Sequence, residues 1–118
     1  MSLAIRLQPE TARVTGFAAI AAAYPAYIGI GAAMTKPIRI ITLINLTDAA
    51  MMFSFDGIND HLPMTANGYL VLDITSNKTI PQGFFLAEGQ RLYVRQLDAL
   101  EIPTSRGVYL TTFYGAEI

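Results

Sequence analysis

The chain has 118 residues, of which 53% are hydrophobic and 14% charged, and its formal net charge is -1. A chain of this length forms one domain with one core. The absence of cysteine excludes disulfides, thiolate metal sites and thiol catalysis. No basic stripe is present, so we expect no nucleic-acid binding. With so few charges, part of the apolar surface is expected to lie against other subunits.

The first residues, 1–16, have a mixed composition and precede a long apolar run. We interpret them as an extended N-terminal arm that reaches a neighbouring subunit, ahead of a single domain at residues 17–118. Glu10 lies before the apolar run and the start is long for a signal peptide, so we do not expect a cleaved leader.

No charged residue interrupts the stretch from Phe17 to Met34. Its length suits a transmembrane helix. However, it is rich in weakly hydrophobic alanine and contains Pro25 and two glycines, so we expect no membrane partner. Two alternatives remain for its structure. The alanines favour a helix over Glu10–Ala23, whereas Pro25 would break a helix and Tyr24–Gly31 has the composition of a strand.

The remainder of the chain is typical of β-strands. The β-branched stretch Arg39–Asn45 is nearly all apolar, which predicts a strand covered on both faces. Strands at intervals of roughly ten residues, with turn signals between them, predict an all-β fold, a small antiparallel β-sandwich or jelly-roll-like barrel. The further strands expected are Ala50–Phe55, Gly68–Ile74, Phe84–Leu86, Arg91–Leu97 and Val108–Tyr114.

Two of these strands alternate in polarity, which assigns their faces. Leu92 and Val94 occupy one face of the first strand, and Val108 and Leu110 occupy one face of the second. The opposite faces carry Arg and Tyr, which are enriched at protein interfaces. A phosphate or DNA contact is the less favoured alternative, because no further basic residue extends the patch. The predicted interface residues are Tyr24, Tyr27, Arg91, Tyr93, Arg95, Tyr109 and Phe113.

Any chemistry would be expected in the block that ends at the single histidine. His61 follows Asp60 and lies near Asp56, but Ser54, the nearest nucleophile, has no elbow turn or visible oxyanion donor. The acid spacing lacks the alternating oxygens of a calcium loop, and one histidine is too few for structural zinc. We therefore expect a surface turn in which Asp56 and Asn59 cap backbone amides, with no catalytic residue, metal or cofactor.

A second turn is expected just before this block. Asn45, Thr47 and Asp48 follow an apolar strand, and their side chains are suited to hydrogen-bond the local backbone.

The order of these motifs resembles a group of small virion proteins of tailed bacteriophages. The similarity covers about residues 17 to 115. The shared pattern comprises F-x-x-I-x-x-x-Y-x-x-I-G with one extra residue before the isoleucine (Phe17, Ile20, Tyr24, Ile28, Gly29), Asn-x-Thr-Asp (Asn45, Thr47, Asp48), Ser-Phe-Asp-Gly-x-x-Asp-His (Ser54, Phe55, Asp56, Gly57, Asp60, His61), Asp-x-x-x-Asn (Asp73, Asn77), a glycine before a tyrosine-bearing strand (Gly89, Tyr93), Pro-x-Ser-x-Gly (Pro103, Ser105, Gly107) and aromatic-Tyr-Gly (Phe113, Tyr114, Gly115).

This resemblance implies a non-enzymatic structural component of the virion, either a capsid-decorating protein or a subunit of the head-to-tail neck. It implies extended structure over Phe17–Gly31, although the alanines of residues 18–23 depart from the pattern. The implied partners are further copies of the chain in a ring or trimer, and major capsid, portal or connector proteins. A carbohydrate- or receptor-binding β-sandwich is the alternative.

Overall fold

Strand β4 (Ile38–Asn45) alternates between buried and half-buried residues. The computed structural model describes residues 5–73 and 89–117. Ile41 and Leu43 are buried in β4, whereas Ile40, Thr42 and Ile44 are half-buried on the other side. Within the single chain, the expectation that this strand is covered on both faces is therefore wrong. One face packs into the core and the other faces outward, as is common in antiparallel sheets.

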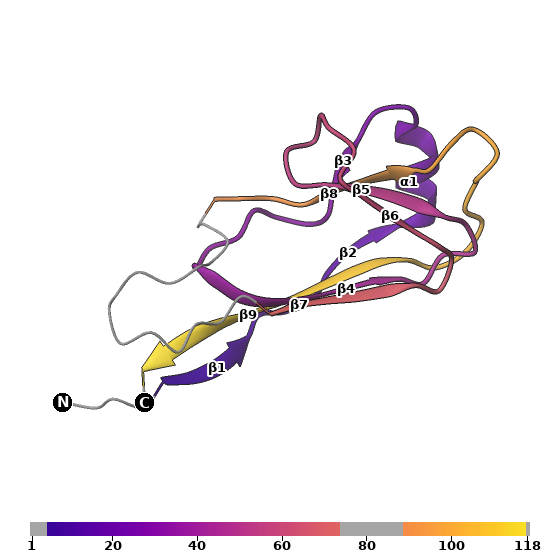
Figure 1. Cartoon of the computed structure of the whole chain (residues 1–118). Coiled ribbons are helices and arrows are strands. Elements are labelled where there is room, and N and C mark those ends of the chain that lie inside the picture. Colours follow the sequence, from indigo (N-terminus) through magenta and orange to yellow (C-terminus); the bar gives the residue numbers. More distant parts are fainter. Residues whose placement is uncertain (1–4, 74–88, 118) are drawn as a thin grey trace.

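Strand β4 belongs to a five-stranded antiparallel sheet in which β9 is the longest strand. β9 pairs with β4 along one edge and with both β1 and β2 along the other. In Figure 1, β1 and the end of β9 run side by side to one end of the molecule. The sheet has the order β1-β9-β4-β7, with β2 also on β9, and comprises β1 (Ile5–Pro9), β2 (Arg13–Gly16), β4, β7 (Tyr69–Asp73) and β9 (Gly107–Glu117).

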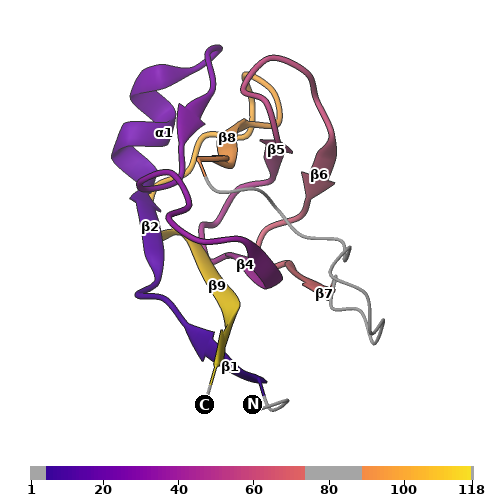
Figure 2. The ribbon, with the colours of Figure 1, turned by 90° about the vertical axis from the view of Figure 1, so that its left-hand side faces the viewer.

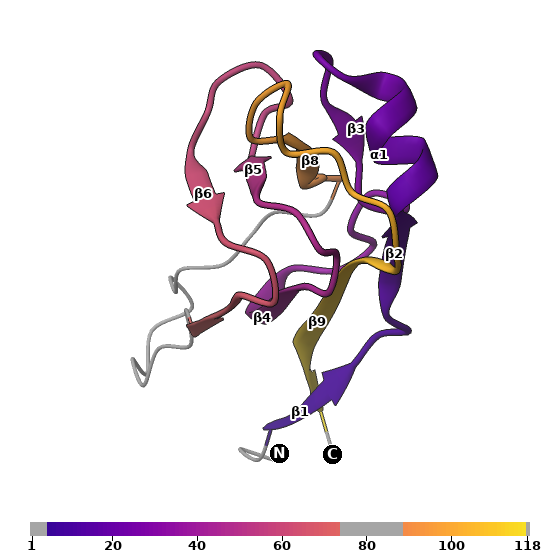
Figure 3. The same ribbon diagram turned by 90° about the vertical axis from the view of Figure 1, so that its right-hand side faces the viewer.

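A smaller sheet of four strands packs over the first one, as Figures 2 and 3 show from two sides. Two antiparallel sheets packed together confirm the predicted all-β sandwich. The second sheet has the order β3-β8-β5-β6, with β3 (Ile28–Gly29), β5 (Met51–Ser54), β6 (Leu62–Met64) and β8 (Tyr93–Gln96).

The core lies between the inner faces of the two sheets. The predicted inward residues are all buried, namely Leu92 just before β8, Val94 in β8, and Val108 and Leu110 in β9. Burial of such side chains is worth about 1.5–3 kcal/mol each. The buried apolar cluster consists of Ile20, Ile30, Met34, Ile38, Ile41, Leu43, Ala49, Met51, Phe53, Leu92, Val94, Val108 and Leu110.

The uncharged run Phe17–Met34 contains both of the predicted alternatives, a helix and an extended segment. Helix α1 (Phe17–Ala23) occupies the alanine-rich part, and only Ile20 of its residues is buried. The chain is extended again at β3, after Pro25. The extended structure implied by the resemblance is therefore wrong for residues 17–23, where alanine's helix propensity prevails. The helix begins at Phe17 rather than Glu10 because residues 13–16 pair with β9 as β2.

Among the residues that the structure describes, no helix is long and apolar enough to cross a membrane.

The predicted N-terminal arm is extended over its described part. Residues 5–9 and 13–16 pair with β9 of the same chain and form the edge of the five-stranded sheet. A contact between residues 1–16 and a neighbouring subunit stays a prediction, as does the domain boundary after residue 16. The strand predicted at Phe84–Leu86 and the motif position Asn77 lie outside the described residues.

Candidate functional site

The block that ends at His61 folds as a loop organised by one carboxylate. Oδ1 of Asp56 accepts hydrogen bonds from the backbone amides of Ile58 and Asn59, both at 2.8 Å, and from the Ser54 hydroxyl at 2.8 Å. Oδ2 accepts from the side-chain amide of Asn59. These donors, led by the Asn59 and Ile58 amides, lower the pKa of Asp56 well below its usual range. The predicted turn capped by Asp56 is thus present, whereas the side chain of Asn59 donates to Asp56 instead of capping a backbone amide as predicted.

A second carboxylate fastens this loop to other parts of the chain. Oδ1 of Asp60 accepts a hydrogen bond of 2.5 Å from the Tyr27 hydroxyl, and Oδ2 accepts one of 3.0 Å from Arg95. The Arg95 guanidinium also lies 5.4 Å from the centre of the Tyr27 ring. The hydrogen bond from Tyr27, followed by that from Arg95, lowers the pKa of Asp60. We call Tyr27, Asp60 and Arg95 the loop latch.

The ring of His61 stabilises the same loop. Its Nδ1 accepts a hydrogen bond of 3.0 Å from the backbone amide of Phe55. The Ser54 hydroxyl donates to Asp56 and accepts from the amide of Gly57. Both candidate catalytic groups are therefore engaged in hydrogen bonds that hold the loop. Within residues 5–73 and 89–117, no group of three or more His, Asp or Glu side chains is placed to hold a metal ion.

The Asn-x-Thr-Asp turn is built into the interior. Asn45 is fully buried, and its Nδ2 donates to the carbonyls of Ala49 and Thr65 at 2.9 and 3.1 Å. Its Oδ1 accepts from the amide and the hydroxyl of Thr47. Asp48, at the surface, accepts hydrogen bonds from the hydroxyl and amide of Thr104, which lower its pKa. The motif thus fixes the connection between the two sheets, in accord with the predicted turn.

The predicted basic-aromatic face of Arg91, Tyr93 and Arg95 is largely engaged within the chain. Nε of Arg91 donates to the Gly31 carbonyl at 2.7 Å, and its guanidinium lies 5.8 Å from the centre of the Tyr93 ring. Arg95 donates to the carbonyls of Gln96 and Leu97. These contacts leave the two guanidinium groups poorly suited to bind a phosphate chain.

The remaining predicted interface residues lie in different places. Tyr24 is half-buried at the C-terminal end of α1 and precedes a cis peptide bond to Pro25. Tyr109 and Phe113 lie on the outward side of β9, opposite the buried Val108 and Leu110. The structure therefore brings Tyr27 and Arg95 together in the loop latch, and places Tyr109 and Phe113 on another surface.

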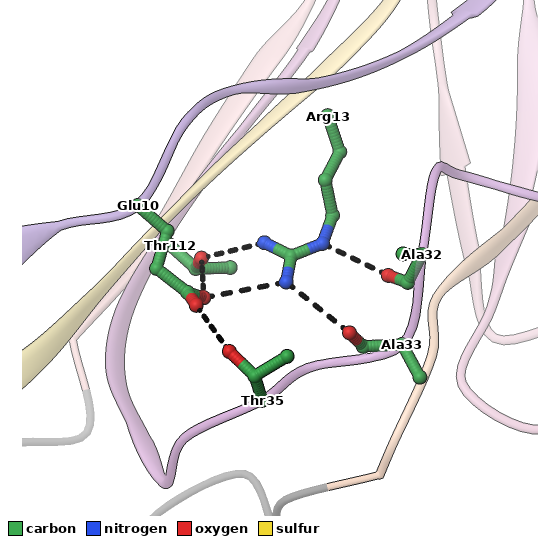
Figure 4. A network of polar contacts seen from close by, with 6 residues as sticks. All are labelled: Glu10, Arg13, Ala32, Ala33, Thr35 and Thr112. Atoms are coloured by element: carbon green, nitrogen blue, oxygen red, sulfur yellow. Dashed lines mark hydrogen bonds and ion pairs between the residues drawn. The ribbon is translucent and has the colours of Figure 1, made fainter.

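A polar network missed by the sequence reasoning attaches the N-terminal strands to the domain. Arg13 donates to Thr112 Oγ1 at 2.8 Å, to the Ala32 carbonyl at 2.9 Å and to Glu10 at 3.3 Å (Figure 4). Thr35 and Thr112 each donate to Glu10 at 2.7 Å. Burial alone would raise the pKa of Glu10, but these hydrogen bonds and the charge of Arg13 lower it overall. The network was missed because Glu10 and Arg13, which are three residues apart, find their other partners about 20 to 100 residues away.

An open depression of about 490 Å³ lies beside this network. Arg13 and Glu10 at its wall are already hydrogen-bonded to each other and to their neighbours. It also has no aromatic wall of the kind typical of a sugar-binding site. Its lining residues are Glu10, Thr11, Ala12, Arg13, Val14, Gly31, Ala32, Ala33 and Thr35.

The most conspicuous surface is the outward side of the five-stranded sheet. Tyr69 is 74% exposed, Val71 55% and Val14 51%. Exposed apolar residues are ordinary when scattered, but a contiguous group marks an interaction surface. We define the outer apolar face as Pro9, Val14, Ile40, Thr42, Ile44, Tyr69, Val71, Tyr109, Thr111 and Phe113.

Sequence reasoning identified part of this face. Tyr109 and Phe113 were found because β9 alternates clearly. Tyr69 and Val71 were missed, although Gly68–Ile74 alternates in the same way and places them opposite Leu70 and Leu72. Val14 was missed because the strand that carries it was not expected.

Comparison with known proteins adds no relative: no protein-family model, no curated protein and no solved structure matches this chain.

Proposed function

We propose that this chain is a non-enzymatic structural subunit of a tailed-bacteriophage virion, which assembles into a symmetric oligomer as a capsid decoration or neck component. The observation that carries the proposal is the outer apolar face. It has residues on all five strands of the larger sheet and includes side chains that are more than half exposed in the single chain. A domain with 14% charged residues has little polar surface with which to offset such a face in water.

The motif blocks support the same proposal indirectly. The residues that looked most capable of chemistry, Ser54, Asp56 and His61, stabilise a loop. Asn45 and Thr47 fix a buried turn. The sequence pattern that resembles small phage virion proteins thus consists largely of residues that specify the sandwich, which is consistent with a role in assembly.

Two measurements test this proposal. The purified chain is expected to form a discrete oligomer in sedimentation velocity, and a monomer at every concentration would contradict the proposal. Immunogold labelling of purified virions tests the location. Label over the shell indicates decoration, label at the tail vertex indicates the neck, and particles without label would refute a place in the virion.

The alternative, a carbohydrate- or receptor-binding module, has less support. Such a module would present aromatic rings beside polar groups in a concavity. The depression described above has no aromatic lining residue, and the exposed Tyr69 and Tyr109 belong to a sheet face. Binding of the monomeric chain to a glycan array would favour this alternative.

A further inference from the structure

We infer that the outer apolar face is a self-association surface, on which a second copy of this chain packs through the same face about a two-fold axis. The inference rests on the proposed assembly role and adds to it the surface and the symmetry of one contact.

The register of the strands makes the face continuous. Tyr109 of β9 and Ile44 of β4 are cross-strand partners, and each pairs onward with an exposed residue of the next strand. Neighbouring side chains on one face of an antiparallel sheet lie close enough to form a single apolar surface. The three cross-strand rows are Val14–Tyr109–Ile44–Tyr69, Thr111–Thr42–Val71 and Pro9–Phe113–Ile40–Asp73.

The centre of the face is self-complementary. Thr42 and Thr111 are cross-strand partners in the middle row. A hydroxyl both donates and accepts a hydrogen bond, so the same pair on a second copy can satisfy this one. A carboxylate or an ammonium group at the centre would instead oppose its own copy.

The charge of the face also favours a second copy of the chain as the binding partner. Among the described residues of the three rows, Asp73 at the end of the third row is the sole charged one. Asp73 is itself engaged in an interaction. Apart from Asp73 at its edge, the face therefore opposes no like charges when it meets a copy of itself, and its centre offers no charge to an acidic or basic partner.

The size of the face fits the core of such a contact. Strands about 4.8 Å apart and residues about 3.4 Å apart give it a span of roughly 15 Å in each direction between Cα atoms. With side chains it covers on the order of 400 Å², about half of the area that a standard interface buries on each partner. The polar loops around the face would supply the rim.

The first test is a charge placed on the face. Val71→Lys changes a residue that is 55% exposed on an edge strand, so the fold should tolerate it. Two such lysines would face an apolar surface or each other, and self-association should weaken about tenfold or more. Leu100→Lys, at a loop residue that is 91% exposed, is the matched control and should leave self-association unchanged.

The second test uses the absence of cysteine from the chain. Thr42→Cys places a single thiol near the centre of the face, and Leu100→Cys places one away from it. Packed sheets lie about 10 Å apart, so a bismaleimide of that span should cross-link the Thr42→Cys variant into dimers and leave the Leu100→Cys variant monomeric in denaturing gels.

The outcomes separate this inference from the proposed function. A wild-type chain that is monomeric at every concentration refutes both. An oligomer that persists in Val71→Lys without dimeric cross-links through Thr42→Cys refutes the two-fold contact and leaves the assembly role standing. An odd number of copies, such as a trimer, also refutes it, since two-fold pairing gives even numbers. If Val71→Lys fails to fold by circular dichroism, the cross-linking result decides.

Discussion

The Tyr27 hydroxyl donates a hydrogen bond of 2.5 Å to Asp60, and this contact joins segments that are 33 residues apart. Tyr27 immediately precedes β3, and Asp60 lies in the loop that follows β5. Arg95 of β8 donates to the same carboxylate. The loop latch therefore attaches the 55–61 loop to the residue just before β3 and to β8 of the smaller sheet, and it gives the acidic residue beside the single histidine a structural role.

We expect the Tyr27 hydroxyl to titrate at unusually high pH. Burial, followed by the hydrogen bond to Asp60, raises the pKa of Tyr27 to about 12. The difference between ultraviolet titrations of wild type and Tyr27→Phe should show this ionisation. In Asp60→Asn the pKa should fall toward its ordinary value, because the amide is uncharged. A Tyr27 pKa unchanged by Asp60→Asn would contradict the latch.

The sign of the stability effect follows from the direction of this shift. A raised pKa means that the folded chain retains the phenolic proton while the unfolded chain loses it. The contribution of Tyr27 is therefore fully present below about pH 10 and is lost as the pH rises toward about 12. In urea unfolding, wild type should lose more stability over this window than Tyr27→Phe.

Acid should weaken the same latch. The pKa of Asp60 is lowered, so its contribution to the free energy of unfolding is present above the ordinary aspartate pKa and decreases as the pH falls through the lowered value. Asp60→Asn should be less stable than wild type at neutral pH, and this difference should shrink in acid. Leu100→Ala, at an exposed loop residue, is the control and should show the wild-type pH dependence. A constant difference between Asp60→Asn and wild type would count against the assignment.

Asn45→Ala should be strongly destabilising. The substitution removes the hydrogen bonds to the Ala49 and Thr65 carbonyls and leaves these acceptors without that donor in the interior. A loss of about 2–4 kcal/mol in the free energy of unfolding is expected. Asn59→Ala is the control because Asn59 is exposed, and it should cost less than about 1 kcal/mol. Equal effects of the two variants in chemical denaturation would disprove the structural role of Asn45.

Gly57→Ala should destabilise the loop for two reasons. Gly57 has a φ of +78°, and a Cβ there would lie 3.3 Å from the Tyr93 ring. Strained backbone of this kind costs of order 1–3 kcal/mol. Gly16→Ala is the matched control, because Gly16 has a φ of -74° and a Cβ added there would meet no atom within 4 Å. Similar melting temperatures for the two variants would show that the loop does not need glycine.

The predictable part of the fold is the part governed by local patterns. The alternation of Arg91–Leu97 and Val108–Tyr114 correctly assigned Leu92, Val94, Val108 and Leu110 to the core. The turn residues of the Asn45 and Asp56 motifs were also recognisable, because their hydrogen bonds are mostly to residues two to four positions away.

The unpredicted part depends on contacts between distant residues. Strands β1 and β2 form by pairing with β9, about 100 residues later in the chain. The sequence of the two strands themselves therefore does not predict them. The latch was not foreseen for the same reason, although two of its three members were singled out as interface residues. The outer apolar face becomes visible only when Val14, Ile44 and Tyr69 are placed in one row.

The most direct test of the assembly role is the mass of the wild-type chain in solution. Native mass spectrometry and sedimentation velocity over a range of concentrations should both find one discrete oligomer, with an even number of copies, that Leu100→Lys preserves and Val71→Lys disrupts. A chain that remains monomeric at every concentration would contradict the account.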